Sequence, residues 1–212
     1  MKNIIKIIKK SLPLLLFSNI AKAADGAYLG TSSGVTTVAQ FLVNGATAIG
    51  VVLFLYGLYG FHGRGQNPNQ YTVAFCFSNL IAGTFLLISS QIYAWTVNSF
   101  SHDSDWATNS TMLSVSGKLS DDAAAISGTF LGKYISTDTF NTLMGLIYLV
   151  GLISFLKGIY LIKEAGQLSG GQGQGGMAPA FWHMVGGCAV MNILQFGCFI
   201  SWLFGVPYLC AE

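Results

Sequence analysis

The chain has 212 residues, of which 52% are hydrophobic and 8% are charged, and its mean hydropathy is +0.58. Soluble domains carry about 25% charged residues, so composition excludes a soluble globule and predicts an integral membrane protein. Five of the ten basic residues precede position 24, which leaves five basic against eight acidic residues in the rest of the chain. Such a chain has no basic surface for gripping nucleic acid, and we expect no direct nucleic-acid binding.

Residues 1–23 have the pattern of a secretory signal peptide. Four lysines precede a short apolar stretch at residues 12–20, and Ala21-Lys22-Ala23 matches the small-x-small cleavage pattern. We expect cleavage after Ala23; the alternative is an uncleaved anchor.

Four apolar runs follow, at residues 38–61, 71–97, 140–162 and 178–204. Each has the length of about 20 residues that a helix needs to cross a bilayer. Gly, Asn and Pro mark a turn at residues 62–70, and a Gly-rich linker occupies residues 163–177. The sequence therefore predicts an all-α protein with four transmembrane helices in two similar hairpins, at residues 24–97 and 139–212. The polar segment 98–138 between them is expected to form a loop with a short helix.

The two predicted hairpins nearly repeat each other 101 positions apart. The sequence Phe-Leu-Tyr-Gly-Leu-Tyr at residues 54–59 leads to Gly65-Gln66, and Phe-Leu-Lys-Gly-Ile-Tyr at residues 155–160 leads to Gly166-Gln167. Small residues on these runs would let helices approach closely. The candidates for helix packing are Ala46, Gly50, Gly57, Gly158, Gly186 and Gly187.

A cleaved signal would leave the new N-terminus outside the inner membrane. Both short turns would then be cytoplasmic, and residues 98–138 and the C-terminus would be periplasmic. Arg64, Lys157 and Lys163 would lie toward the inner side, as the positive-inside rule requires. These three are candidate contacts for lipid headgroups or partner subunits. Lys157 lies within a predicted span, where it either snorkels to headgroups or makes a specific contact.

No constellation of catalytic or metal-binding residues is present in the sequence. His62, His102 and His183 are scattered along the chain without ligand spacing, and no nucleophile motif or phosphate-binding loop occurs. We therefore expect neither an enzyme nor a bound metal or cofactor. Among the four cysteines, a Cys198–Cys210 disulfide would need the chain to fold back at Pro207, and we do not expect it.

The second hairpin resembles a known family. The order Phe-Leu-Lys-Gly-Ile-Tyr, Lys163, the Gly-rich turn, Ala180 and Gly186-Gly187 is similar to small inner-membrane proteins of type IVB secretion and conjugation systems, of the IcmC/DotE and TraQ type. The wider plan, a signal followed by two apolar helices around a short turn, also resembles conjugative pilins. The first copy departs from this pattern, because Tyr56 stands where the second has Lys157.

The resemblance implies a structural inner-membrane subunit of a type IV conjugation or secretion apparatus. Such a subunit would act by helix packing, with membrane lipids, further copies of itself and other apparatus subunits as partners, and it would be extracellular if assembled into a pilus. The alternative from another class is a small transporter or channel, since duplicated halves often build carriers.

The expected topology can be tested by labelling single cysteines, placed at Asn69, Ser116 and Gly173 in a variant without the native cysteines. In intact cells only the Ser116 probe should react with an impermeant maleimide, because the other two sites would face the cytoplasm. The intact mass of the extracted protein should lack residues 1–23. Labelling at Gly173, or a mass that includes Met1, would contradict this topology.

Overall fold

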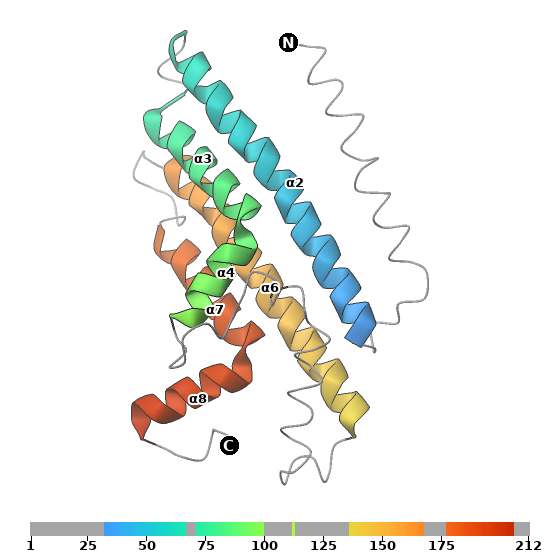
Figure 1. Cartoon of the computed structure of the whole chain (residues 1–212). Helices are drawn as coiled ribbons and strands as arrows, with labels where there is room; N and C mark the ends of the chain where they lie inside the picture. Colours follow the sequence, from blue (N-terminus) through green and yellow to red (C-terminus); the bar gives the residue numbers. More distant parts are fainter. Residues whose placement is uncertain (1–31, 67–70, 100–111, 113–135, 168–176, 206–212) are drawn as a thin grey trace.

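The computed structural model describes residues 32–66, 71–99, 112, 136–167 and 177–205. The described residues are all-helical and contain no strand. The helices are α2 (Ser32–Arg64), α3 (Val73–Leu87), α4 (Ser89–Asn98), α6 (Thr137–Gln167), α7 (Met177–Met191) and α8 (Ile193–Phe204) (Figure 1). The expected signal peptide, the short helix within residues 98–138 and the C-terminal tail lie outside the described residues.

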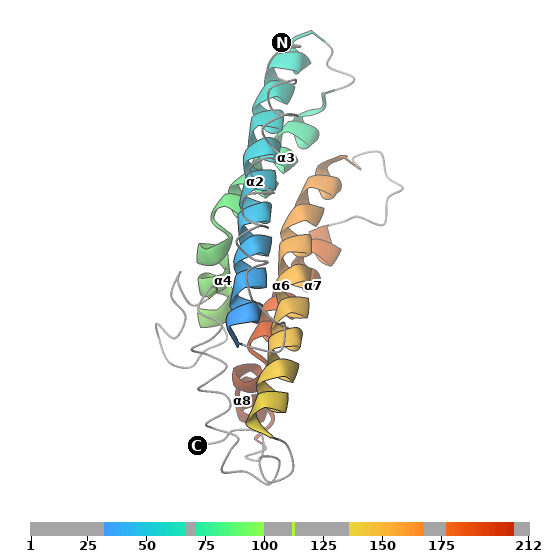
Figure 2. The ribbon, with the colours of Figure 1, turned by 90° about the vertical axis from the view of Figure 1, so that its right-hand side faces the viewer.

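The helices form two antiparallel pairs that pack into one bundle. Helix α2 lies along α3 in the first pair, and α6 lies along α7 in the second (Figures 1 and 2). Helix α6 also contacts α2 and α3, so it joins the two pairs. The apolar part of α6 is consequently more buried than that of α2. We call α2–α4 hairpin one and α6–α8 hairpin two.

Among the described helices, only α2 and α6 are by themselves long and apolar enough to cross a membrane. In place of the second and fourth spans, each expected as one helix, the structure has pairs broken near the middle. Helices α3 and α4 meet at 80°, and α7 and α8 meet at 103°. The described chain thus has two candidate membrane spans, or up to four if each bent pair counts as one.

Polar residues stand beside both breaks. At Asn192 the side-chain amide donates to Cys188 O at 2.8 Å, the same oxygen that accepts from Asn192 N at 3.1 Å, and the backbone leaves the helical region at φ −122° and ψ 44°. In hairpin one, Ile88 has φ −105° and ψ 26° and is followed by Ser89-Ser90. Serine pairs and side chains that compete for backbone carbonyls are common causes of sharp kinks.

Glycines let the backbones of each hairpin touch. In hairpin one, a Cβ placed on Gly83 would lie 2.6 Å from Phe54 N and 2.8 Å from Gly50 O. In hairpin two, a Cβ on Gly187 would lie 2.5 Å from Phe155 N and 2.7 Å from Gly151 O. Real Cβ atoms do not come so close to backbone, so only glycine permits either crossing.

The matching contacts give the register of the repeat. Gly151 and Gly158 in α6 follow Gly50 and Gly57 in α2 by 101 positions. Gly187 follows Gly83 by 104 positions, and the break at Asn192 follows that at Ile88 by the same number. The two copies of Gly-Gln also lie at comparable stages: Gly65-Gln66 directly follows α2, and Gly166-Gln167 are the last two residues of α6.

Hairpin two is displaced along the bundle axis relative to hairpin one. The repeat equivalent of Gly145 is Asn44, yet a Cβ on Gly145 would lie 2.6 Å from a methyl group of Val35, nine residues closer to the start of α2. Nine helical residues correspond to about 13 Å. At the other end, Gly166 lies against Ser78 in α3. The turn end of hairpin two therefore stops short of that of hairpin one, as Figure 2 shows.

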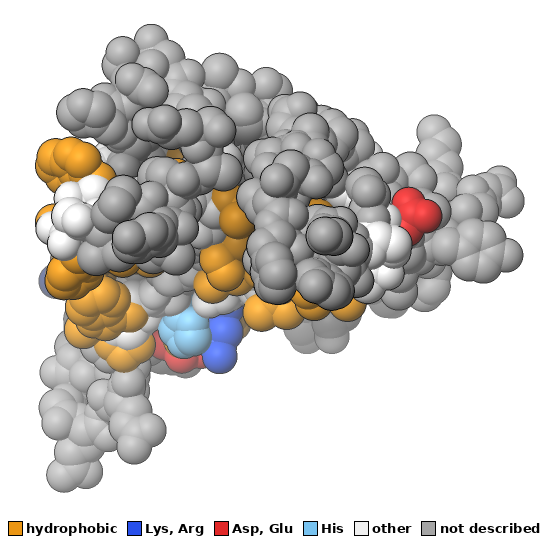
Figure 3. Space-filling model, turned by 90° about the horizontal axis from the view of Figure 1, so that it is seen from below, with side chains coloured by type: hydrophobic (Ala, Val, Ile, Leu, Met, Phe, Trp, Pro, Cys, Tyr) orange, Lys and Arg blue, Asp and Glu red, His pale blue; other side chains and the backbone are white. Residues whose placement is uncertain are grey.

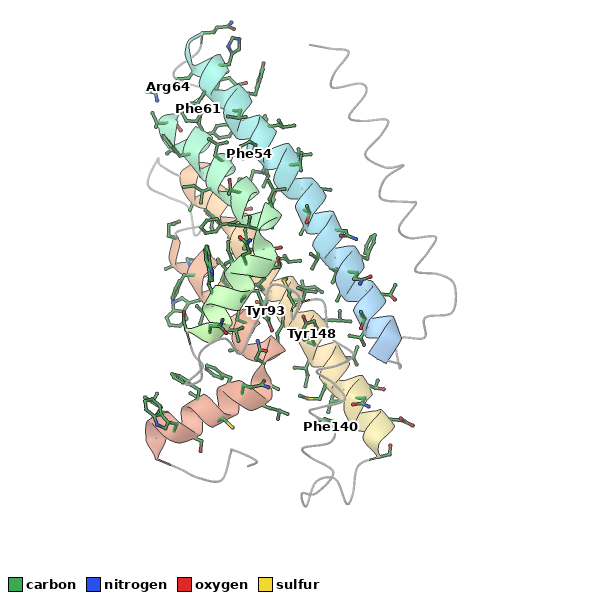
Figure 4. The ribbon with its side chains drawn as sticks, viewed as in Figure 1. Phe54, Phe61, Arg64, Tyr93, Phe140 and Tyr148 are labelled. Carbon is green, nitrogen blue, oxygen red and sulfur yellow. The ribbon has the colours of Figure 1, made fainter. Side chains whose placement is uncertain are left out.

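Large apolar side chains cover the outside of the bundle. The exposed ones on α2 include Ile49, Val51, Val52, Leu55, Leu58 and Phe61. Viewed from below, apolar side chains occupy much of the described surface, and charged ones form only small patches (Figure 3). Aromatic rings gather where α2 meets α3, including the edge-on pairs Tyr59–Tyr71 and Phe61–Phe77, with Phe61 and Arg64 at the upper end of α2 (Figure 4). Such a surface fits a lipid environment with an aromatic belt at its boundary.

The glycine contacts can be tested with two neighbouring residues of α7. Gly187→Leu should lower the free energy of unfolding by at least about 1–3 kcal/mol, because its side chain would overlap the backbone of α6. Gly186→Leu is the matched control, since a Cβ there would meet nothing within 4 Å. Detergent unfolding followed by circular dichroism measures both. Equal stability of the two variants would contradict the close crossing.

Candidate functional site

The two hairpins are joined by a buried polar contact at the helix breaks. Tyr93 in α4 donates its hydroxyl hydrogen to Asn192 Oδ1 at 3.0 Å, while Asn192 Nδ2 donates to Cys188 O. Both side chains are buried, and the Tyr93 ring packs edge-on against Phe155 with 6.2 Å between ring centroids. Tyr93 therefore links hairpin one to Asn192 at the break and to Phe155 in α6. We call these residues the polar junction.

The polar junction lies opposite the middle of the long helices. A Cβ on Gly151, one residue from the centre of α6, would lie 2.8 Å from the backbone nitrogen of Met191, which directly precedes Asn192. Likewise, Gly50 lies two residues past the centre of α2 and against Leu87, which precedes the break at Ile88. If the long helices span a bilayer, both breaks lie within it.

A second tyrosine ties the loop between the hairpins to the bundle. Tyr148 in α6 donates its hydroxyl hydrogen to the backbone carbonyl of Met112, and both residues are buried. Figure 4 shows Tyr148 and Tyr93 in the central part of the bundle. Met112 belongs to the polar segment 98–138, so at least this residue of the loop is held against α6.

The basic residues expected to contact headgroups or partners occupy different surroundings. Arg64 is exposed at the last residue of α2. Lys157 is exposed on α6. Lys163 is half-buried, donates to the Tyr160 hydroxyl at 3.1 Å and lies 4.9 Å from that ring's centroid. The fold does not gather the three into one site.

Five of the six expected packing residues are buried or meet a neighbouring helix. Ala46 is buried on α2, Gly50 and Gly57 face α3, and Gly158 and Gly187 lie at the α6–α7 crossing. Gly186 meets no atom within 4 Å, so it makes no packing contact inside the chain. The four glycines that meet a neighbouring helix do so within the chain, and they hold the hairpins closed.

The disulfide expectation is wrong for Cys198. Cys198 is disulfide-bonded, whereas Cys76 and Cys188 are buried and are not part of a disulfide. The sequence has four cysteines, and the remaining one, Cys210, lies outside the described residues. Gly205 ends α8 in the left-handed conformation, at φ 65°.

Within the part of the chain that the structure describes, no group of three or more histidine, cysteine or acidic residues could hold a metal ion. His62 is exposed near the end of α2, and His102 lies outside the described residues. His183 contacts Ser154 across the α6–α7 pair, with 3.3 Å between Nδ1 and Oγ. Among the residues that the structure describes, no carboxylate contacts this pair.

Sequence reasoning missed the polar junction and the Ser154–His183 pair. The available signal was a polar residue inside an apolar run, as at Tyr93, Asn192 and Ser154. That signal cannot reveal the partner, because Tyr93 and Asn192 are 99 positions apart and meet only through the packing of α4 on α7.

Comparisons of the chain with protein-family models, with curated proteins and with solved structures find no match.

The polar junction can be tested by removing one hydroxyl group. Tyr93→Phe should lower the free energy of unfolding by about 0.6–1.7 kcal/mol, the range measured for hydrogen bonds between membrane helices. Tyr59→Phe serves as the control, because Tyr59 is 43% exposed. If Tyr93→Phe is no less stable than this control in detergent unfolding, the bond does not join the hairpins.

Proposed function

We propose that the chain is a structural membrane subunit that acts by assembling with other subunits, and that it carries out no reaction of its own. The observation that carries this proposal is that the glycines close each hairpin from within, so that the outer faces of the bundle are formed by large apolar side chains. Backbone contacts at Gly50–Gly83 and Gly151–Gly187 close each hairpin, while large apolar side chains remain on the outside. Rigid hairpins with apolar outer faces suit a part that is built into a larger membrane assembly.

We assign this assembly to a type IV conjugation or secretion apparatus. Support comes from the resemblance of the second hairpin to small inner-membrane proteins of such systems. The partners proposed are membrane lipids, further copies of the chain and other subunits of the apparatus. A pilin-like role within a filament is the extracellular variant of the same proposal.

We further propose an inner-membrane location in which the turns at residues 62–70 and 163–177 face the cytoplasm. Arg64 at the upper end of α2 supports this orientation through the positive-inside rule. The disulfide at Cys198 supports it independently, because stable disulfides belong to oxidising compartments such as the periplasm. In this orientation four membrane segments cross, two of them as bent pairs.

The polar junction favours a second candidate, a small transporter or channel. Carriers with internal repeats often place their binding sites near the bilayer midplane, where broken helices meet. Tyr93 and Asn192 have this arrangement. The two side chains already satisfy each other, however, and Phe155 packs against the Tyr93 ring. The junction therefore serves better as a fastening between hairpins than as a binding site.

A tryptophan scan of the outer faces tests the structural proposal. Val51, Leu55 and Leu58 are exposed on α2, and Leu143, Leu146 and Val150 are exposed on α6. Tryptophan is tolerated where a face meets lipid and disrupts a contact where it meets another subunit. We expect at least one face to lose about tenfold or more in DNA transfer or secretion while its membrane abundance stays unchanged.

The two candidates give opposite results in this assay. A structural subunit should keep transfer with Asn192→Leu if the protein accumulates, whereas a carrier that uses the junction should lose it. Tolerance of tryptophan at all six positions, together with loss of activity in an abundant Asn192→Leu protein, would favour the transporter.

A further inference from the structure

Hairpin two carries a polar set at positions where hairpin one is apolar or uncharged. The repeat register pairs three positions of hairpin one with three of hairpin two: Leu53 with Ser154, Tyr56 with Lys157, and Asn79 with His183. The side chain of Asn79 is fully buried inside the bundle, whereas His183 is half-buried and Lys157 is exposed. The backbone geometry of the two crossings matches, so the fold does not require the polar residues in hairpin two.

Ser154 and His183 are held together across the α6–α7 crossing. The Ser154 hydroxyl lies 3.3 Å from His183 O and 3.3 Å from His183 Nδ1, and it can donate its one hydrogen to either atom. When it donates to Nδ1, Nε2 carries the proton of the neutral ring and can donate to an anion. Lys157 lies three residues after Ser154, on the same side of α6. Its neighbour Gly158 contacts Met184, the neighbour of His183.

Lys157 lies deep along the bundle. On α3, Gly57 of α2 meets Cys76 and Leu80, and Gly166 of α6 meets Ser78, which lies between these two residues. The end of α6 is therefore level with Gly57 along the bundle axis. From there Lys157 is nine residues down α6, and Arg64 is seven residues up α2. At 1.5 Å per residue, Lys157 lies about 24 Å along the axis from Arg64. With Arg64 at the headgroups, Lys157 lies near the middle of a bilayer of about 40 Å.

A charge at this depth needs a partner. A charged lysine within the bilayer is costly unless it pairs or reaches water, and its stem extends only roughly 6 Å. Within the described residues, no ion pair to Lys157 is found. The acid of α6 on the same side, Glu164, is seven residues away, or about 10 Å.

We propose that Lys157, positioned beside Ser154 and His183, binds a carboxylate in the middle of a transmembrane helix of a partner subunit. This inference rests on the proposed structural role and names one of its interfaces. The positive charge of Lys157 favours a carboxylate as its partner. The depth of Lys157 in the bilayer favours a carboxylate on a transmembrane helix, because a lipid phosphate stays at the membrane surface. The acids among the described residues, Asp138 and Glu164, lie near the ends of α6, so these two acids of a second copy would not reach this depth.

The test uses the full chain in phosphatidylcholine vesicles with a leucine-rich transmembrane peptide as the probe. One peptide carries a central glutamate, and the matched peptide carries glutamine. Energy transfer from a donor attached at Gln66→Cys reports association. We expect the glutamate peptide to bind about fivefold to thirtyfold more tightly than the glutamine peptide. Lys157→Gln should abolish this preference, and Lys157→Arg should keep it.

Hairpin one supplies the matched control. Tyr56→Gln changes the equivalent exposed position and should leave the preference for glutamate unchanged. His183→Asn introduces the residue that hairpin one has there, and it should lower the preference while Lys157 remains; an unchanged preference would remove His183 from the site.

Equal binding of the two peptides, or a preference that survives Lys157→Gln, would overturn the proposal. The proposal would also be overturned if phosphatidylglycerol in the vesicles removed the preference of the wild-type chain for the glutamate peptide. The anionic headgroup of that lipid would then occupy Lys157. The tryptophan scan measures assembly at positions of α2 and α6 other than Lys157. The structural role can therefore be supported by the scan even when the peptide test rejects the carboxylate site, so the two proposals are tested independently.

Discussion

The structure depends on contact between backbones at two glycine crossings. At each crossing one glycine of the long helix faces one glycine of the shorter helix, and a methyl group on either would overlap a backbone atom of its neighbour. In a bilayer the hydrophobic effect does not drive helices together, so van der Waals contact at such close approaches supplies much of the attraction. Because the contacts recur in both hairpins, the same constraint fixes the axial position of α3 and α7, and with it the position of both breaks.

Each shorter helix, α3 and α7, is interrupted a few residues after its glycine crossing, and polar residues lie at or beside each interruption. Helix α7 ends at Met191, where Asn192 takes the Cys188 carbonyl and accepts the Tyr93 hydroxyl hydrogen. Backbone groups inside a membrane must find partners within the protein, so a break needs polar side chains beside it. Tyr93 and Asn192 meet this need at the break of hairpin two and connect the two hairpins at the same time. The main role of the polar junction is thus structural, because it connects the two hairpins beside the break.

The two hairpins share a plan and have different surroundings. Hairpin two is displaced by about 13 Å along the axis, which follows from the contact of Gly145 with Val35. The displacement places the polar set of Ser154, Lys157 and His183 at the level of the apolar centre of α2. The two copies of the repeat therefore differ in their polar residues, with Leu53, Tyr56 and Asn79 in hairpin one and Ser154, Lys157 and His183 in hairpin two. This difference gives the molecule two sides of unlike chemistry.

The sequence by itself determined the class of this protein and much of its plan. Low charge and four long apolar runs predicted an all-helical chain with helices apolar enough to cross a membrane, and the spacing of Gly50, Gly57, Gly151 and Gly158 indicated the repeat. Local patterns could not determine which of these runs stay straight. Asn79 and Asn192 both donate their side-chain amide to the carbonyl four residues earlier, yet α3 continues through Asn79 and α7 ends before Asn192. Local patterns also could not reveal that Gly186 faces open space while Gly187 touches α6, or that Cys198 forms a disulfide. Tertiary structure decided these features, because each depends on the distance between segments that sequence order leaves free.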